Sequence, residues 1–133
     1  MENAMGAFAS QPPAKMQLST RRIGGVAVVD INGAITYGDG SAKLHETVRD
    51  LLNQDDRKIL LNLREVHYID SSGLGELMRS YTSVRNQGGE MKVANLTRRV
   101  HDLLKMTRMD AIFRINDDET AAIGSFDNSQ NAS

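Results

Sequence analysis

Residues 59–75 read ILLNLREVHYIDSSGLG and lead from a strand pattern into a helix pattern. The run at 59–63 is nearly all apolar, which is typical of a parallel strand covered on both faces. Beyond it, apolar residues recur at helical spacing until Gly88-Gly89 ends the pattern: Leu74, Leu77, Met78, Tyr81 and Val84. A buried strand followed directly by an amphipathic helix predicts one step of an α/β fold.

The residues before this step predict a hairpin, a loop and a helix. A predicted edge strand at 17–23 and a β-branched, apolar run at 26–31 flank Gly24-Gly25, which is a hairpin signal. A glycine-rich loop is expected at 33–40. Ser41 is then the expected N-cap of a helix that ends near Asp55-Asp56 and buries Leu44, Val48, Leu51 and Leu52.

The residues after this step predict two further strands and two further helices. A strand is expected at 91–94, and Asn95 or Thr97 is expected to cap a helix that carries Val100, Leu103, Leu104 and Met106. A last strand at 112–115 and a short helix from Asp117-Asp118 through Ile123 complete the pattern. The order β-β-α-β-α-β-α-β-α predicts an α/β fold with a mixed, mostly parallel sheet and an antiparallel N-terminal hairpin. We expect a single domain over 16–126, with flexible tails at 1–15 and 127–133.

Composition narrows the function classes. The 133 residues carry 16 Lys+Arg and 17 Asp+Glu, a net charge of −1, and the even balance argues against nucleic acid as a partner. Without cysteine, disulfides, thiol nucleophiles and Cys-ligated metals are excluded. No apolar run is long enough to span a membrane, and no signal-peptide pattern begins the sequence. We therefore expect a cytoplasmic protein that does not insert into a membrane.

The strand-to-helix junction carries the candidate chemistry. Asp70, Ser71 and Ser72 fall at the predicted start of a helix, where free backbone N–H groups and the helix dipole favour negative charge. Gly73 and Gly75 have no side chains to project from the first turn, so that a partner can approach its backbone closely. Three interpretations remain open on the residues alone: helix capping, phosphate acceptance by Ser71 or Ser72, and a nucleophilic serine.

Catalysis is the least favoured of these interpretations. The junction lacks the Gly-x-Ser-x-Gly pattern of a serine hydrolase. The histidines at 45, 67 and 101 show no ligand spacing for a metal, and the loop at 33–40 lacks the Lys-Ser/Thr ending of a phosphate-binding loop. We therefore expect no catalytic residue, no metal and no cofactor.

The motifs resemble a known family. Leu61-Asn62-Leu63, the run Ile69 to Gly75, and Gly88-Gly89-Glu90-Met91 are similar to a STAS domain, and more narrowly to the bacterial anti-sigma factor antagonists, over about 17–125. The resemblance implies that Ser71 is the phosphorylated residue, with Ser72 second, and that Asp70 is its neighbouring acid. It also implies a kinase-fold anti-sigma factor that binds the unphosphorylated form, a serine phosphatase that restores that form, and no enzyme activity in this chain.

By the same resemblance, the partner-binding surface comprises Thr36, Asp39, Asp70, Ser71, Ser72, Gly73, Leu74 and Gly75. Family members commonly carry Gly-Glu-Leu-Asp before the first helix. Here the match is Gly33-Ala34-Ile35-Thr36, followed by an extra residue. Two alternatives remain: a STAS subunit of a membrane lipid- or anion-transport complex, and a structural subunit of a stress-sensing assembly.

Overall fold

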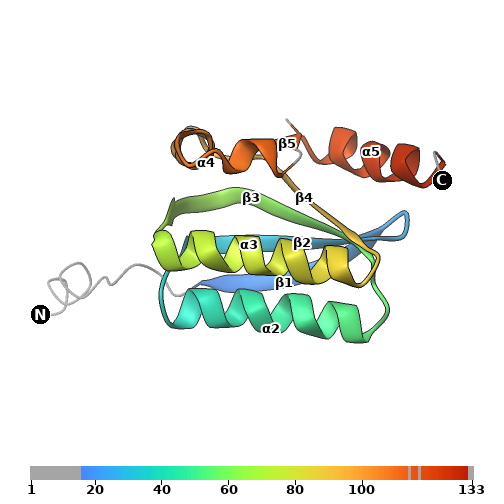
Figure 1. Cartoon of the computed structure of the whole chain (residues 1–133), viewed down its shortest axis with the longest axis horizontal. Coiled ribbons are helices and arrows are strands. Elements are labelled where there is room, and N and C mark those ends of the chain that lie inside the picture. Colours follow the sequence, from blue (N-terminus) through green and yellow to red (C-terminus); the bar gives the residue numbers. More distant parts are fainter. Residues whose placement is uncertain (1–15, 114, 117, 132–133) are drawn as a thin grey trace, which may run out of the picture.

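The strands form one mixed sheet, and helices lie on both of its faces (Figure 1). The structure, a computed structural model, describes residues 16–113, 115–116 and 118–131. The elements in chain order are β1 (Gln17–Ile23), β2 (Val26–Ile35), α2 (Asp39–Asn53), β3 (Lys58–Ile69), α3 (Ser71–Asn86), β4 (Glu90–Ala94), α4 (Arg98–Met106), the 3-10 turn η1 (Met109–Ala111), β5 (Ile115–Asn116) and α5 (Glu119–Asn131).

The sheet has the order β1-β2-β3-β4-β5. Gly24 and Gly25, with φ angles of 57° and 82°, turn the chain so that β1 and β2 pair antiparallel. β2, β3, β4 and β5 then run parallel, each joined to the next through a helical connection. The predicted α/β class and the antiparallel hairpin on a mostly parallel sheet are confirmed.

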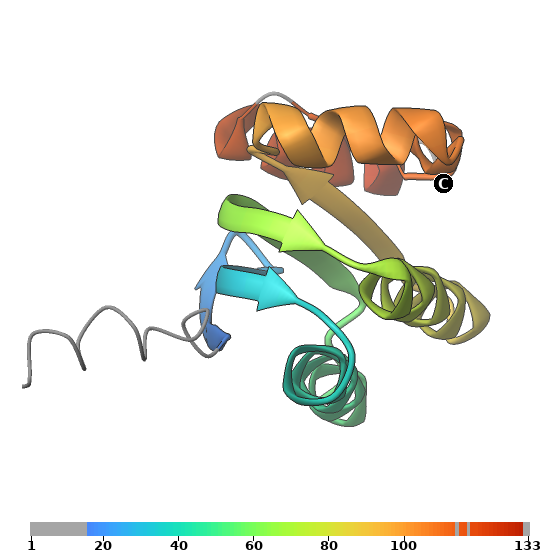
Figure 2. The same ribbon diagram turned by 90° about the vertical axis from the view of Figure 1, so that its left-hand side faces the viewer.

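Two layers of helix cover the sheet (Figures 1 and 2). α2 and α3 pack on one face over a core of strand side chains that includes Val29, Ile59 and Leu61, all fully buried. α5 covers part of the other face, where its side chains pack on Val26, Val28, Leu60 and Ala94. Both faces of the central strands are therefore buried, which explains the continuous apolar run at 59–63.

α5 is also attached by polar contacts. The Lys92 ammonium, on β4, donates a 2.6 Å hydrogen bond to Ser125 Oγ and lies 4.9 Å from the centre of the Phe126 ring. At the start of the helix, Glu119 pairs with Arg21 of β1 at 2.6 Å. These contacts join the first strand, the fourth strand and the last helix.

The strands before the junctions are longer than the sequence predicted. β2 continues to Ile35 and β3 to Ile69, with shifts in their pairing between Asp30 and Asn32 and between Gly33 and Ala34. The predicted loop at 33–40 is therefore shortened to a connection after Ile35. Both strands therefore continue several residues beyond the ends that the apolar pattern predicted, at 31 and 63.

Two other predictions are corrected. Ser41 is not the N-cap of α2, because the helix begins at Asp39 after Gly38, and the Ser41 hydroxyl instead donates to the Thr36 carbonyl at 3.0 Å. The last strand is Ile115–Asn116 rather than 112–115. Phe113 was predicted to lie in that strand because it is apolar, but it lies between η1 and β5. Its ring packs edge-on against the ring of Tyr81, with 5.3 Å between the ring centres.

The fold extends past the C-terminal end that the sequence predicted. The backbone of α5 is helical to Asn131, past the end of the folded body expected at 126. The tail predicted at 1–15 and the residues at 132–133 lie outside the described residues. Among the helices that the structure describes, none combines the length and apolar character that crossing a membrane requires.

Candidate functional site

The site forms where β2 and β3 end side by side. Their parallel register pairs Ile35 with Ile69, so the loop after β2 meets the junction that begins α3. The Asp70 backbone N–H donates to the Ile35 carbonyl at 3.3 Å, which continues the strand pairing into the junction. Loops at the carboxyl ends of parallel strands are the usual place for binding residues in α/β folds.

Asp70 ties these two segments together. It is the N-cap of α3, and its Oδ1 accepts a 2.8 Å hydrogen bond from the Gly73 N–H. Its Oδ2 accepts a 3.0 Å hydrogen bond from the Tyr37 N–H, in the loop after β2. The pKa of Asp70 is lowered below its ordinary value, because both hydrogen bonds favour the ionised carboxylate. The bond from the Tyr37 N–H has the larger effect, and the bond from the Gly73 N–H has the next largest.

The two serines differ in exposure. Ser71 is the first residue of α3 and is exposed, whereas Ser72 is half-buried. Within the part of the chain that the structure describes, no side chain holds the Ser71 hydroxyl by a hydrogen bond. Ser71 therefore presents a free hydroxyl to solvent, at the positive end of a helix and directly after an ionised carboxylate.

Gly73 allows α3 to begin against β2. A Cβ at position 73 would lie 2.0 Å from the Ile35 carbonyl oxygen and 2.8 Å from Cγ2 of Ile69. Gly40, in the first turn of α2, is similarly close, since a Cβ there would lie 2.7 Å from the Ala34 carbonyl oxygen. Gly75 is different, because a Cβ there would meet only the guanidinium of Arg79, at 3.2 Å.

The remaining predicted residues lie nearby with distinct contacts. Leu74 is half-buried and packs against the core. Thr36 is half-buried, and its carbonyl accepts hydrogen bonds from the N–H and the hydroxyl of Ser41 at 2.9 and 3.0 Å. Asp39 is exposed and pairs with Lys43 at 3.4 Å, one helical turn on. The structure therefore brings the loop after β2 to the Asp70–Gly75 turn, with the Asp39 carboxylate beside Lys43.

Sequence reasoning missed three exposed hydrophobic side chains around this site. Tyr37 is 83% exposed, Tyr68 is 51% exposed and Met106 is 80% exposed. Tyr68 and Met106 border an open groove of about 520 Å³ between the end of β3 and α4. The groove is also lined by Ile69, Arg98, Arg99, Val100, Asp102 and Leu103. An isolated aromatic in a glycine-rich loop and a tyrosine at the end of an apolar strand were the available signals.

Contiguous exposed apolar surface indicates a binding site, and Tyr68 and Met106 line one apolar groove. Among the described residues, Ile23 is the other large exposed hydrophobic residue, and it lies in the hairpin at the far end of β2 from Ile35. The rest therefore border the junction of Asp70 and Ser71 or the groove beside it. This arrangement suits contact with a protein partner.

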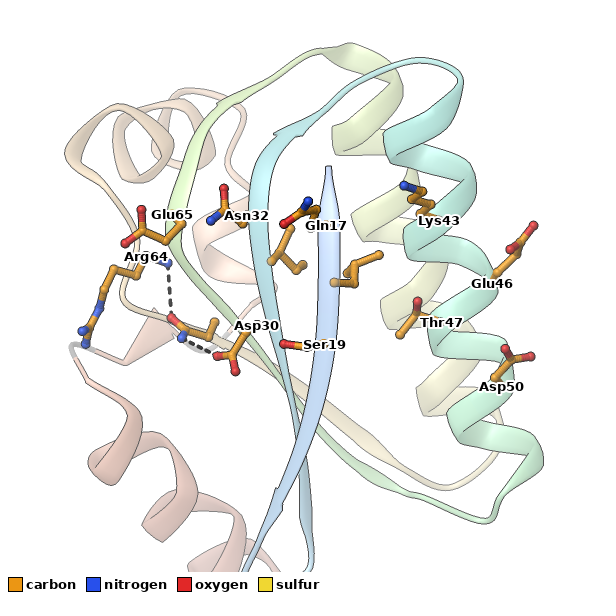
Figure 3. Close-up of a pocket in the computed structure, with 13 residues that line it drawn as sticks. Gln17, Ser19, Asp30, Asn32, Lys43, Glu46, Thr47, Asp50, Arg64 and Glu65 are labelled. Carbon is orange, nitrogen blue, oxygen red and sulfur yellow. Dashed lines mark hydrogen bonds between the residues drawn. The ribbon is translucent and has the colours of Figure 1, made fainter. Parts of the chain in front are cut away.

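A larger hollow, of about 770 Å³, follows the edge strand β1 (Figure 3). Its lining is mostly polar, and some of its polar groups form hydrogen bonds with one another or with nearby backbone. Asn62 donates to Asp30 at 2.7 Å and accepts from the Arg64 N–H at 3.2 Å, and Lys43 donates to the Met16 carbonyl at 3.0 Å. Its lining exposes less apolar surface than the groove bordered by Tyr68 and Met106 does.

Among the hydrogen bonds of the described residues, none joins a histidine to Ser71 or Ser72. His45, on α2, contacts the buried Glu76 of α3 at 3.3 Å, and His67 is exposed on β3. Within residues 16–113, 115–116 and 118–131, no group of three or more His, Asp or Glu side chains is arranged to hold a metal ion. The chemistry that the junction itself offers is an accessible hydroxyl beside a carboxylate.

Comparison with known proteins finds relatives that match most of the chain. An anti-sigma F factor antagonist from Paenibacillus polymyxa is 28% identical over 108 residues, which covers 81% of this chain and 92% of that protein. The crystal structure of an anti-sigma factor antagonist from Mycobacterium paratuberculosis superposes with a TM-score of 0.77 at 18% identity, covering 86% of this chain and 97% of that one.

The same fold also occurs in proteins with other names. The crystal structure of a sulfate transporter family protein from Wolinella succinogenes has a TM-score of 0.70 at 20% identity, covering 80% of this chain and 88% of that one. Identities this low in solved structures show the fold alone. The STAS domain family matches residues 17–122, which is most of the chain. The chain belongs to the STAS domain family, with homologues named anti-sigma factor antagonists.

Proposed function

We propose that this protein is an anti-sigma factor antagonist whose binding is switched by phosphorylation of Ser71. The observation that carries the proposal is the exposed Ser71 hydroxyl at the start of α3, inside a surface bordered by exposed Tyr37 and Tyr68. The unphosphorylated form binds an anti-sigma factor and so releases the sigma factor. The homologues named anti-sigma factor antagonists support this role.

Phosphorylation of Ser71 is suited to ending a contact while leaving the fold intact. A phosphoserine carries nearly two negative charges at neutral pH. Asp70 is already ionised beside it and occupies the Gly73 N–H, so the phosphate gains little local compensation beyond the helix dipole. Because Ser71 is exposed, the new charge changes the docking surface without entering the core. Ser72 is half-buried and is the less accessible acceptor.

The partners follow from the resemblance to the antagonist family. We infer an anti-sigma factor with a kinase fold, which both binds this surface and phosphorylates Ser71, and a separate serine phosphatase that reverses the change. This protein then acts as substrate and binding partner in the cytoplasm, with no catalytic step of its own. The surface would comprise Thr36, Asp39, Asp70, Ser71, Ser72, Gly73, Leu74 and Gly75, with Tyr68 at its margin.

The test is affinity capture from a lysate of the source cells with three baits: wild type, Ser71→Asp and Ser71→Ala. We expect wild type and Ser71→Ala to retain a kinase-fold anti-sigma factor and Ser71→Asp to lose it, because only Ser71→Asp adds charge. The retained protein should transfer phosphate from ATP to wild type and to Ser72→Ala, but not to Ser71→Ala. Equal recovery of a transporter ATPase on all baits would contradict the proposal.

A further inference from the structure

Tyr37 is the most exposed of the large hydrophobic side chains that the structure describes, at 83%. It lies in the loop between β2 and α2, next to the Asp70–Ser71 turn, because its own N–H donates to Asp70 Oδ2 at 3.0 Å. An aromatic ring left in water forgoes the stabilisation that burial would give. The structure thus places an unburied aromatic ring beside the proposed phosphorylation site.

The backbone on both sides of Tyr37 is fixed. The Thr36 carbonyl accepts two hydrogen bonds from Ser41, at 2.9 and 3.0 Å. The Gly38 carbonyl accepts the Ala42 N–H at 2.9 Å, and Gly38 itself has a φ of 88°, a conformation that favours glycine. Together with the bond to Asp70, these contacts constrain the backbone that carries the exposed ring, so that a partner meets the ring at a defined place beside the Asp70–Ser71 turn.

A ring presented in this way is an efficient anchor for a protein interface. Tyrosine has two side-chain torsions, so little conformational entropy is lost when it is bound, and tyrosines are enriched among the residues that dominate binding energy. The Asp70 carboxylate accepts the N–H of Tyr37 itself, whereas exposed Asp39, two residues on, is paired with Lys43 at 3.4 Å and contributes less net charge. Charge complementarity therefore favours cationic side chains on the partner around the ring.

We propose that Tyr37 is the anchor of the interface and determines which anti-sigma factor binds, by inserting its ring into an apolar pocket with an Arg or Lys at its rim. The inference rests on the proposed function, since the partner is the kinase-fold anti-sigma factor that binds the Ser71 surface. It adds a specificity residue outside the Asp70–Gly75 turn. An anti-sigma factor without such a pocket is excluded as a tight partner.

The test measures the dissociation constant between the full chain and the purified anti-sigma factor that wild type captures, by titration calorimetry. We expect Tyr37→Ala to weaken binding by about 30-fold or more, as truncation of an interface anchor does. Tyr37→Phe keeps the ring and should stay within about threefold of wild type. Ile23→Ala, which removes an exposed apolar side chain from the remote hairpin, is the matched control and should leave the affinity unchanged.

The outcomes show whether this inference fails alone or together with the proposed function. If Ser71→Asp abolishes binding while Tyr37→Ala binds like wild type, the switch stands and Tyr37 is not the anchor. If Tyr37→Phe loses as much affinity as Tyr37→Ala, the hydroxyl is recognised and the apolar pocket is wrong. If no anti-sigma factor is captured, both proposals fail. Thermal unfolding of Tyr37→Ala should match wild type, because the exposed ring supports little of the fold.

Discussion

Substitution of Gly73 by alanine tests whether the start of α3 depends on close contact with β2. The added methyl group would lie 2.0 Å from the Ile35 carbonyl oxygen and 2.9 Å from its carbonyl carbon. Backbone atoms of a buried strand cannot rotate away as a flexible side chain can. The helix must therefore move, and the Asp70 bonds to the Ile35 carbonyl and the Tyr37 N–H must lengthen.

The expected cost is the balance of three effects. Overpacking against backbone costs about 3 kcal/mol, the upper end of the usual range. Weakening the bonds of Asp70 costs a further 1–2 kcal/mol, roughly one hydrogen bond to a charged group. Alanine in a helix favours the folded state by up to about 1 kcal/mol over glycine. The balance predicts a loss of about 3–4 kcal/mol in the free energy of unfolding.

Gly75→Ala is the matched control, because its Cβ would meet only the end of the Arg79 side chain. Arg79 can move, so this variant should be neutral or up to about 1 kcal/mol more stable than wild type. Urea unfolding followed by circular dichroism gives both values, provided that the dependence on urea concentration stays the same. Equal stability of Gly73→Ala and Gly75→Ala would refute the proposed close contact.

Three further measurements test the same structure. Asp70→Asn keeps one acceptor of two, so at neutral pH it should lose about 1 kcal/mol of stability. The pKa of Asp70 is lowered from 3.8, so the ionised carboxylate stabilises the fold above that pH, and this stabilisation is lost as the pH falls through the lowered pKa. The urea unfolding curves of wild type and Asp70→Asn should therefore converge in acid. Thr97→Ala removes the N-cap of α4 and should cost about 1 kcal/mol in urea unfolding, and no change would contradict the capping role. Phe126→Ala leaves a cavity at a fully buried site beside Lys92, so it should lower the free energy of unfolding by about 3–5 kcal/mol and speed amide exchange along α5. Unchanged exchange would show that contacts other than Phe126 hold α5 on the sheet.

The sequence predicted the fold where one local rule dominates. Gly24-Gly25 gave the hairpin, and the periodicity from Leu74 to Val84 gave α3. It misplaced the last strand, because Phe113 is buried by packing on Tyr81 rather than by strand pairing. Apolar character reports burial, and burial alone does not distinguish a strand from a turn packed into the core.

Only those features of the site that depend on neighbouring residues in the sequence were predicted. Asp70 as the cap of α3 follows from its position, and the structure confirms it. The bond from the Tyr37 N–H to Asp70 joins residues 33 positions apart, and it depends on the parallel register of Ile35 and Ile69. No spacing rule in a single sequence supplies that register, so the contact between Tyr37 and Asp70 could not be predicted from the sequence.

The order of strands in the sheet is also their order in the chain. During synthesis the N-terminal residues emerge first, at about 5–20 residues per second, so each strand after β1 meets a neighbour that has already left the ribosome. The surface around Asp70 and Ser71 is complete once α3 has emerged. α5 comes last, and until it docks, Val28 and Leu60 remain open on the opposite face. A nascent chain halted before α5 would carry its docking surface together with an apolar patch that chaperones bind.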